Sequence, residues 1–349
     1  MSNFLSSALS LVVSVLAFGL MIFIHELGHF VAAKLSGVQV NEFAIGMGPT
    51  LLKFQRGETK YAIRLLPIGG FVSMEGEDEA SDNPRSFDKK PIWKRAIILV
   101  AGATMNIVLG FILATAVTAS QSGPIASTTI AKFDEGAVSS SVLKVDDQIL
   151  KINGRKINID MDIMFSMARV ADGSATFEVK RDGEKMVLEN VPFKTMTYDG
   201  TDEQSLEVDF KVLPVDRNLG SVLHQSFFLT SSVAKTVWST LIELASGKYG
   251  VNDLSGPVGA ATALSTAFSI DLRNFGMMLC MFTVNIGIFN LLPFPALDGG
   301  RVVFLLIELL RGGKRIDPKY EAYANAIGLG LLFLLMIIVT IGDIGKLIR

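Results

Sequence analysis

Long apolar runs without a single charged side chain dominate the pattern of this chain. Each run is long enough for a helix that crosses a hydrocarbon layer of about 30 Å, which takes about 20 apolar residues. The runs span residues 5–24, 96–120, 274–297 and 322–342. The pattern therefore predicts a polytopic α-helical membrane protein with four transmembrane helices.

The first apolar run must be distinguished from a signal peptide, which has a basic leading region and an apolar core of only about 7–15 residues. No Lys or Arg precedes this run, and it leads directly into a cluster of ionisable residues that begins at His25. We therefore expect the run to be a retained membrane span.

The polar intervals between the runs differ in character. Residues 38–49 and 60–72 combine alternation with paired glycines, which predicts strands and tight turns. The acidic run at 75–82 is interpreted as a solvated loop. Residues 125–214 hold short alternating segments, and Arg-Asp-Gly-Glu at 181–184 is a hairpin signal, so this stretch predicts a small inserted α+β module.

An amphipathic pattern follows the module at residues 220–247 and predicts a helix that packs on it or lies at the membrane surface. The chain then divides into four parts. They are an N-terminal membrane core at 1–121, the inserted module at 122–215, an amphipathic segment at 216–271 and a C-terminal membrane core at 272–349.

The positive charges indicate an orientation. Residues 34–95 and the loop after the third apolar run are rich in Lys and Arg, and such loops face the cytoplasm. The termini and residues 121–271 are then expected on the outer side, which makes the module extracytoplasmic.

Composition narrows the chemistry. Half of the 349 residues are hydrophobic and 19% are charged, against about 25% in soluble domains. The net charge of −2 argues against nucleic acid as a partner, because phosphate binding requires a basic excess. With Cys280 as the only cysteine, neither an internal disulfide nor a cysteine metal cluster can form.

Two of the three histidines lie in the motif His25-Glu26-Leu27-Gly28-His29. Residues four apart share one face of a helix, so both imidazoles can bind one Zn²⁺ while Glu26 acts as the general base. The alternative is a pair of core histidines with ordinary hydrogen bonds. Ionisable groups beside a membrane span are costly and usually functional, which favours the metal site.

A catalytic zinc takes three protein ligands and leaves a fourth position open. His224 lies in the outer region and is a poor third ligand. Asp298 follows a span that runs inward, so it reaches the depth of His25 and His29. The Pro- and Gly-rich backbone before Asp298 is tolerated at membrane depth only where it lines a cavity. The alternative is that Asp298 caps the next helix.

These features together resemble the site-2 proteases, most closely the bacterial regulator of sigma-E protease (RseP) type. The His-Glu-x-x-His motif, the Asn-x-x-Pro-x-Pro-x-Leu-Asp-Gly-Gly segment at 290–300 and the inserted module carry a resemblance that covers essentially the whole chain. It implies that His25, His29 and Asp298 bind zinc, that Glu26 is the general base, and that Asn290 holds the substrate backbone or assists the oxyanion. An interhelix hydrogen bond is the alternative for Asn290.

The resemblance extends to further segments. It implies that residues 46–71 form a membrane-associated β-loop that presents an edge strand to substrate, and that the insert is PDZ-like through residues 136–154. Asp146 stands where relatives usually have Gly, and Asp tolerates a left-handed turn. Residues 101–106 are interpreted as helix packing, and 254–259 as a tight turn.

The resemblance implies an intramembrane zinc metalloprotease that cleaves peptide bonds in or near transmembrane helices. Anti-sigma factors and remnant signal peptides are the expected substrates in regulated intramembrane proteolysis. The site would face the cytoplasmic side of a bacterial plasma membrane. An inactive scaffold would have lost Glu26 or a ligand, and a transporter would show repeated halves, neither of which the sequence has.

Overall fold

The computed structural model describes residues 2–77, 79, 81–197, 204–247 and 254–348. The chain forms two compact units, one of Met1–Leu113 with Val237–Arg349 and the other of Ala114–Thr236. The first unit holds the helical membrane core, and the second holds the inserted module. Each unit is described by itself.

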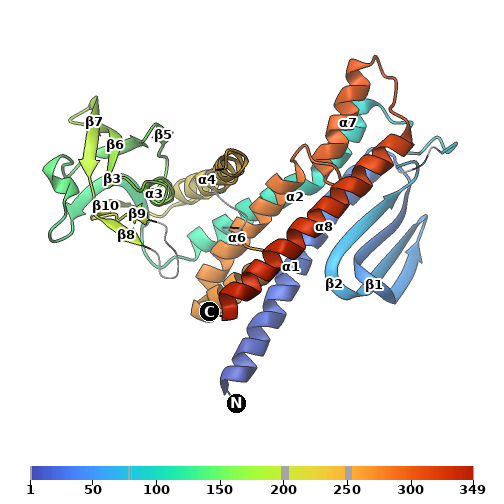
Figure 1. Cartoon of the computed structure of the whole chain (residues 1–349), viewed down its shortest axis with the longest axis horizontal. Coiled ribbons are helices and arrows are strands. Elements are labelled where there is room, and N and C mark those ends of the chain that lie inside the picture. The colour runs from blue at the N-terminus through green and yellow to red at the C-terminus, as the bar shows by residue number, and fades with distance from the viewer. Residues whose placement is uncertain (1, 78, 80, 198–203, 248–253, 349) are drawn as a thin grey trace. The chain divides into compact units, whose positions relative to one another are not determined.

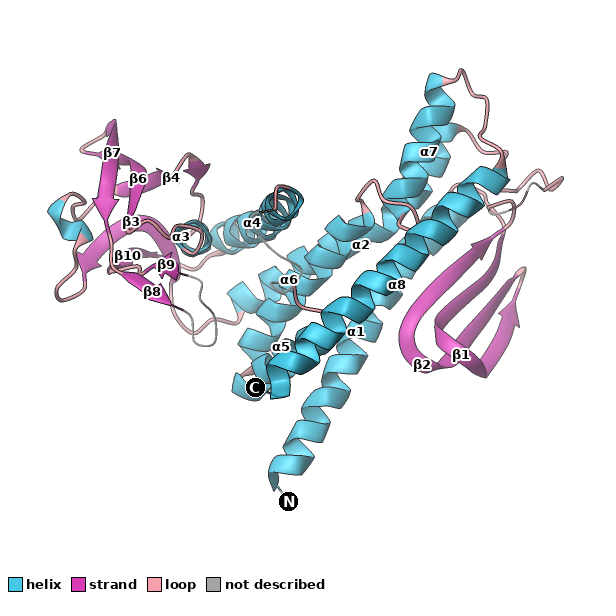
Figure 2. Ribbon diagram, in the orientation of Figure 1, coloured by secondary structure: helices cyan, strands magenta, loops and turns pink. Residues whose placement is uncertain are grey.

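Long apolar helices build the first unit (Figures 1 and 2). Among the described residues, four helices are long and apolar enough to cross a membrane, which confirms the predicted multi-pass architecture. They are α1 (Ser2–Leu35), α2 (Ile92–Ala119), α6 (Leu272–Asn290) and α8 (Pro318–Ile348). The unit also contains two shorter helices, α5 (Pro257–Ile270) and α7 (Asp298–Leu310).

Two helix ends differ from the apolar runs. Helix α1 continues past the run that ends at residue 24, so the two histidines lie within it. Helix α6 ends at Asn290 although the third run continues to residue 297. Pro293 and Pro295 explain this difference, because proline donates no backbone hydrogen bond and disfavours the α conformation of the residue before it.

The predicted strands at 38–49 and 60–72 are confirmed as a long antiparallel ribbon of β1 (Val40–Arg56) and β2 (Thr59–Met74). The ribbon folds back on itself, since residues 42–45 of β1 pair with 60–63 of β2 on one side and 70–73 on the other. The last segment of β2 is therefore an edge of this small sheet.

The acidic run at 75–82 is only partly the expected solvated loop. Glu77 forms an ion pair with Arg301, and its side chain is 13% exposed. The ion pair compensates the burial of the Glu77 carboxylate. Residues 78 and 80 of the run lie outside the described residues.

The second unit is built on a sheet with strand order β10-β3-β4-β6-β7, and β5 pairs with β4 at its side. Strands β8 and β9 form a separate pair. The elements are β3 (Ile125–Phe133), η1 (Ser139–Ser141), β4 (Gln148–Ile152), β5 (Arg155–Lys156), α3 (Asp160–Met167), β6 (Ser174–Arg181), β7 (Glu184–Pro192), β8 (Thr195–Thr197), β9 (Gln204–Leu206) and β10 (Phe210–Val215).

Two turns in this unit have the backbone conformations that the sequence predicts. The hairpin turn between β6 and β7 has positive φ at Asp182 (51°) and Gly183 (88°), as such two-residue turns require. Asp146 has φ 71°, the left-handed conformation that Asp tolerates. A core that includes Ile130, Ile152 and Phe177 supports the sheet.

The described residues of the segment at 216–271 form two different helices. Helix α4 (Leu219–Ala245) begins in the second unit, whereas α5 packs on α1, α6 and α8 in the first. Pro257 is the first residue of α5, so residues 257–259 of the expected tight turn at 254–259 are helical.

Candidate metal centre

Helix α1 carries His25, Glu26 and His29, and the two histidines are buried one helical turn apart. Their rings meet edge to face with centroids 4.8 Å apart, and their Nε2 atoms lie 3.2 Å from each other. The Nδ1 atom of His29 lies 2.8 Å from the backbone oxygen of Ile98 on α2. Both Nε2 atoms therefore face the same point, as the spacing predicts.

Glycines allow helices α1 and α2 to approach closely at this point. A Cβ atom at Gly28 would collide with the backbone oxygen of Ala101, and one at Gly102 would collide with His29 Nε2. The backbone of α2 at Gly102 thus forms one wall of the space beside His29.

Asp298 is the first residue of α7, and its position depends on a tight loop after α6. Cβ atoms at Gly299 and Gly300 would collide with backbone oxygens of residues 291, 292 and 294, so both glycines are required by close packing. Ala296 has φ 75°, and its amide donates to Asn325 Oδ1 on α8 at 3.1 Å. Helix α8 thereby holds the loop that delivers Asp298.

The structure brings His25, His29 and Asp298 together. Asp298 Oδ2 lies 3.1 Å from His25 Nε2 and 3.2 Å from His29 Nε2, although α1 and α7 are distant in the chain. One potential ligand atom from each of the three residues lies within 4.8 Å of the others.

This donor set fits zinc. If both histidines are neutral with their protons on Nδ1, three acceptor atoms face one another, and Asp298 Oδ2 is buried without a hydrogen-bond donor. A divalent cation removes that conflict. Ligands about 2.0–2.2 Å from a tetrahedral zinc lie roughly 3.3–3.6 Å from one another, close to the distances between these atoms.

A cavity of about 340 Å³ opens beside the three residues, and Glu26 and Asn290 also line it. The edge segment of β2, including Gly70, Phe71 and Val72, forms another part of its lining. A Cβ atom at Gly70 would lie 3.0 Å from Glu26 Cγ, so the strand passes directly over the glutamate. Asn290 Nδ2 donates to Ile286 O of its own helix at 2.9 Å.

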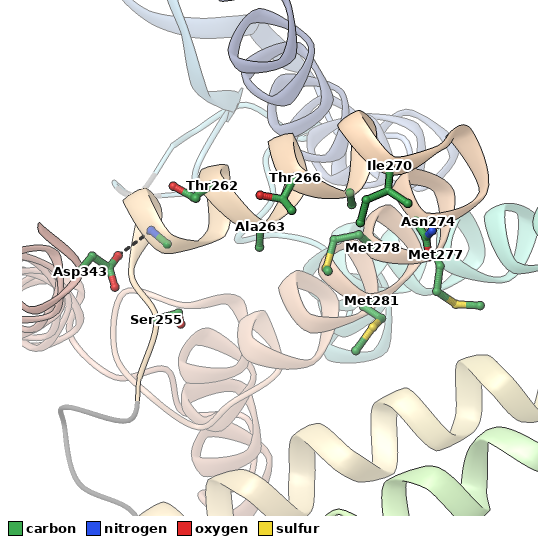
Figure 3. Close-up of a pocket in the computed structure, with 12 residues that line it drawn as sticks. Ser255, Thr262, Ala263, Thr266, Ile270, Asn274, Met277, Met278, Met281 and Asp343 are labelled. Atoms are coloured by element: carbon green, nitrogen blue, oxygen red, sulfur yellow. Dashed lines mark hydrogen bonds between the residues drawn. The ribbon is translucent and has the colours of Figure 1, made fainter. Parts of the chain in front are cut away.

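A larger cavity of about 570 Å³ lies elsewhere in the first unit, between α5, α6 and the end of α8 (Figure 3). Met277, Met278 and Met281 give it an apolar, flexible wall. Its carboxylate, Asp343, already accepts hydrogen bonds from the amides of Gly256 (3.0 Å) and Gly259 (2.7 Å). Because Asp343 is engaged in this way, the smaller cavity with the histidines is the better candidate for catalysis.

Three contacts at the site were missed from the sequence. Residues 101–106 pack helices as expected, but Gly102 also faces His29, and Asn106 Nδ2 lies 3.5 Å from His25 Nδ1. Arg301, one turn after Asp298, pairs with Glu77 at the margin of the cavity. For the contacts of Gly102 and Asn106, the run of small residues that ends in Asn was the only indication in the sequence.

A multi-pass membrane protein with two histidines of a His-Glu-x-x-His helix and one aspartate around a common point defines a class, the membrane zinc metallopeptidases. The sequence model of peptidase family M50 matches residues 13–335 of this chain. The chain therefore belongs to peptidase family M50, the site-2 protease family of zinc-dependent metalloendopeptidases.

Relatives cover nearly the whole chain. A protein of Clostridium acetobutylicum named as a candidate zinc metalloprotease is 36% identical, over 97% of this chain and 98% of its own length. A protein of Fusobacterium nucleatum with the same kind of name is 34% identical, over 97% and 99%. The regulator of sigma-W protease RasP of Bacillus subtilis is 28% identical, over 95% and 97%.

Proposed function

We propose that this enzyme hydrolyses peptide bonds in or near the transmembrane helices of other membrane proteins. His25, His29 and Asp298 bind the zinc, and Glu26 is the general base. The convergence of three potential ligand atoms within 4.8 Å, beside helices that qualify as membrane spans, is the observation that carries the proposal.

The residues around the cavity have distinct roles. Zinc, when bound, polarises the scissile carbonyl group and lowers the pKa of a water molecule. Glu26 accepts a proton from the attacking water and delivers it to the leaving amine. Asn290, at the end of α6 and on the cavity wall, holds the substrate backbone or assists the oxyanion.

Substrate reaches the site as an extended strand. A peptide bond within a helix is inaccessible to a nucleophile, so the substrate helix must unwind locally. The edge segment of β2 at residues 70–73 lines the cavity beside Glu26 and can pair with the unwound chain by strand addition. This assigns the ribbon the role of a membrane-associated β-loop.

The module at 122–215 is a PDZ-like domain that excludes or senses substrate ectodomains, and the part at 216–271 is extracytoplasmic. The site formed by the membrane cores at 1–121 and 272–349 faces the cytoplasmic side of a bacterial plasma membrane, an orientation that the basic segments favour. The relative RasP carries the name of a sigma-W regulator, which supports anti-sigma factors as substrates, with remnant signal peptides as the other class.

The test is Glu26→Gln in purified protein in detergent, with a model transmembrane substrate and with zinc quantified. We expect cleavage to be lost while zinc remains bound, because Glu26 moves a proton and is not a ligand. Glu189→Gln, at an exposed position of β7, is the matched control and should cleave normally. Retained cleavage by Glu26→Gln would overturn the mechanism. Asp298→Asn with zinc quantified separately tests the third ligand.

A further inference from the structure

We propose that Asn106 is a positioning residue for His25, whose ring it orients by accepting a hydrogen bond from Nδ1–H through its amide oxygen. The inference rests on the proposed zinc site. It concerns a side chain of α2 that is fully buried and that lies between the histidine helix and α6.

The neighbouring histidine shows what the site requires. A ring nitrogen that binds metal must be unprotonated, so the proton of a neutral ligating histidine sits on the other nitrogen and needs an acceptor. For His29 the acceptor is the backbone oxygen of Ile98, 2.8 Å from Nδ1. This bond leaves His29 Nε2 free toward Asp298.

His25 faces the same requirement. Its Nε2 atom points at His29 and Asp298, so its proton belongs on Nδ1. Among the side chains that the structure describes, Asn106 brings a polar atom, Nδ2, to 3.5 Å from His25 Nδ1. In that orientation two donors would face each other.

The other half of the Asn106 amide resolves this conflict. Asn106 Oδ1 is buried and has no hydrogen-bond partner. The oxygen and nitrogen of an asparagine amide are nearly identical in shape, and their placement is assigned from the hydrogen bonds around them. Rotating the amide by 180° brings Oδ1 to His25 Nδ1 and gives the proton its acceptor.

The backbone around Asn106 is held from the opposite side. Thr283 Oγ1 on α6 donates to the backbone oxygen of Asn106 at 3.2 Å. Gly287, one turn further along α6, allows a close approach, since a Cβ atom there would lie 2.9 Å from the backbone oxygen of Ala103. Helix α6 therefore fixes the segment of α2 from which Asn106 reaches His25.

The first experiment measures zinc affinity by competition with a chromogenic chelator. Asn106→Leu, which removes the acceptor, should weaken zinc binding by about 10–100-fold, the usual effect of losing a partner of a ligating histidine. Asn106→Asp offers only acceptor atoms and should stay within about threefold of the wild type, since a carboxylate is a common partner of ligating histidines. An Asp variant as weak as the Leu variant would overturn the acceptor role.

Thr283→Val is the matched control, because it removes a buried hydrogen bond at the same interface without touching a histidine. Zinc affinity close to that of the wild type is expected. A loss as large as that of Asn106→Leu would show that packing of α2 on α6, and not the bond to His25, sets the affinity.

The second experiment observes the histidine proton directly by ¹⁵N magnetic resonance of zinc-loaded protein labelled at its three histidines. We expect His25 to be protonated at Nδ1 in the wild type, and a proton on Nε2 would overturn the inference. If the wild type binds no zinc, or if Asp298→Asn binds it equally well, the proposed zinc site itself fails. If the wild type binds zinc through Asp298 and Asn106→Leu matches it, only the role of Asn106 fails.

Discussion

Close approach at single glycines shapes the proposed metal centre. Gly28 and Gly102 let two membrane helices cross so that a backbone segment of α2 lies against His29. Gly299 and Gly300 let the loop after α6 fold onto its own carbonyl groups before Asp298. A methyl group at Gly102 would occupy the space of the His29 ring, and methyl groups at Gly28, Gly299 and Gly300 would collide with neighbouring backbone.

Gly102→Ala should therefore displace the His29 imidazole, because the added Cβ atom would collide with Nε2. We expect zinc affinity to fall by at least about tenfold, as for other changes that disturb a ligating imidazole, and cleavage to fall with it. Zinc content of the purified protein is the measurement.

Gly330→Ala is the matched control, since nothing lies within 4 Å of a Cβ atom at that position of α8. It should retain zinc fully. Full zinc occupancy in Gly102→Ala would contradict the close packing of α2 on His29.

At this scale the sequence predicted that His25 and His29 lie side by side on one helix, because a four-residue spacing on a helix is a local property. It could not predict that Asn106 and Gly102 reach the histidines, since that depends on how two helices cross. It also could not predict the positive φ of Ala296, which costs about 1–2 kcal/mol in an L-residue and is imposed by the surrounding loop.

At the scale of elements, α7 must hold Asp298 at the histidines, and a buried ion pair anchors it. Arg95 at the start of α2 makes two hydrogen bonds with Glu308 near the end of α7, with Nη2–Oε1 2.5 Å and Nη1–Oε2 2.9 Å. The two side chains are only 5% and 8% exposed. Removing one partner would leave the other charge buried and unpaired.

Glu308→Leu should destabilise the protein by about 3–5 kcal/mol, the usual cost of breaking a buried pair, and should weaken zinc binding through α7. Combining it with Arg95→Met should recover most of the loss, because no unpaired charge remains. Thermal unfolding in detergent is the measurement. The less buried pair Lys151–Glu178, with side chains 44% and 23% exposed, is the control, since Glu178→Leu should change stability by less than about 1 kcal/mol. A double variant as unstable as Glu308→Leu would contradict this account.

The β1–β2 ribbon is anchored at its turn by Glu58, which accepts hydrogen bonds from Arg85 and Lys34. Mainly through the Arg85 bonds, these partners lower the pKa of Glu58 from 4.5 to about 2. A carboxyl group with a depressed folded-state pKa stabilises the fold fully above its unfolded value, and this contribution is lost as the pH falls through the folded value.

Hydrogen-exchange protection of the ribbon amides should accordingly decrease as the pH is lowered from about 4.5 toward 2. Glu58→Gln should show lower protection at neutral pH and a smaller decrease on acidification. Protection factors, corrected for the intrinsic exchange rate, are the measurement. An identical decrease in both proteins would assign the pH dependence to other groups.

Element boundaries were less predictable than element types. The four spans follow from hydropathy alone, because the bilayer requires about 20 apolar residues in each. Helix α6 ends well within its apolar run, and that end creates the loop that lines the cavity with Ala296 and Leu297. A run of residues without charge indicates burial in an apolar medium. It does not distinguish a helix from a loop that packs inside the protein.

At the scale of the whole molecule, the proposed zinc site joins parts that are distant in sequence. Helices α1 and α7 carry the proposed ligands, and the unfolded chain does not hold them together. Zinc that binds only the folded state stabilises it by RT ln(1 + [Zn]/Kd), which is about 2.7 kcal/mol at one hundred times Kd. Removal of zinc by a chelator should lower Tm reversibly.

The dependence of Tm on zinc distinguishes a site formed by all three residues from zinc binding by the two histidines alone. We expect Tm of the wild type to rise with zinc concentration over a range above Kd, and Asp298→Asn to show little rise, because two histidines from one helix do not connect the ends of the chain. Equal stabilisation of Asp298→Asn would mean that the histidines bind zinc without the carboxylate. Helix α7 would then be held near the histidines by packing, by the Arg95–Glu308 pair with α2 and by the Arg301–Glu77 pair.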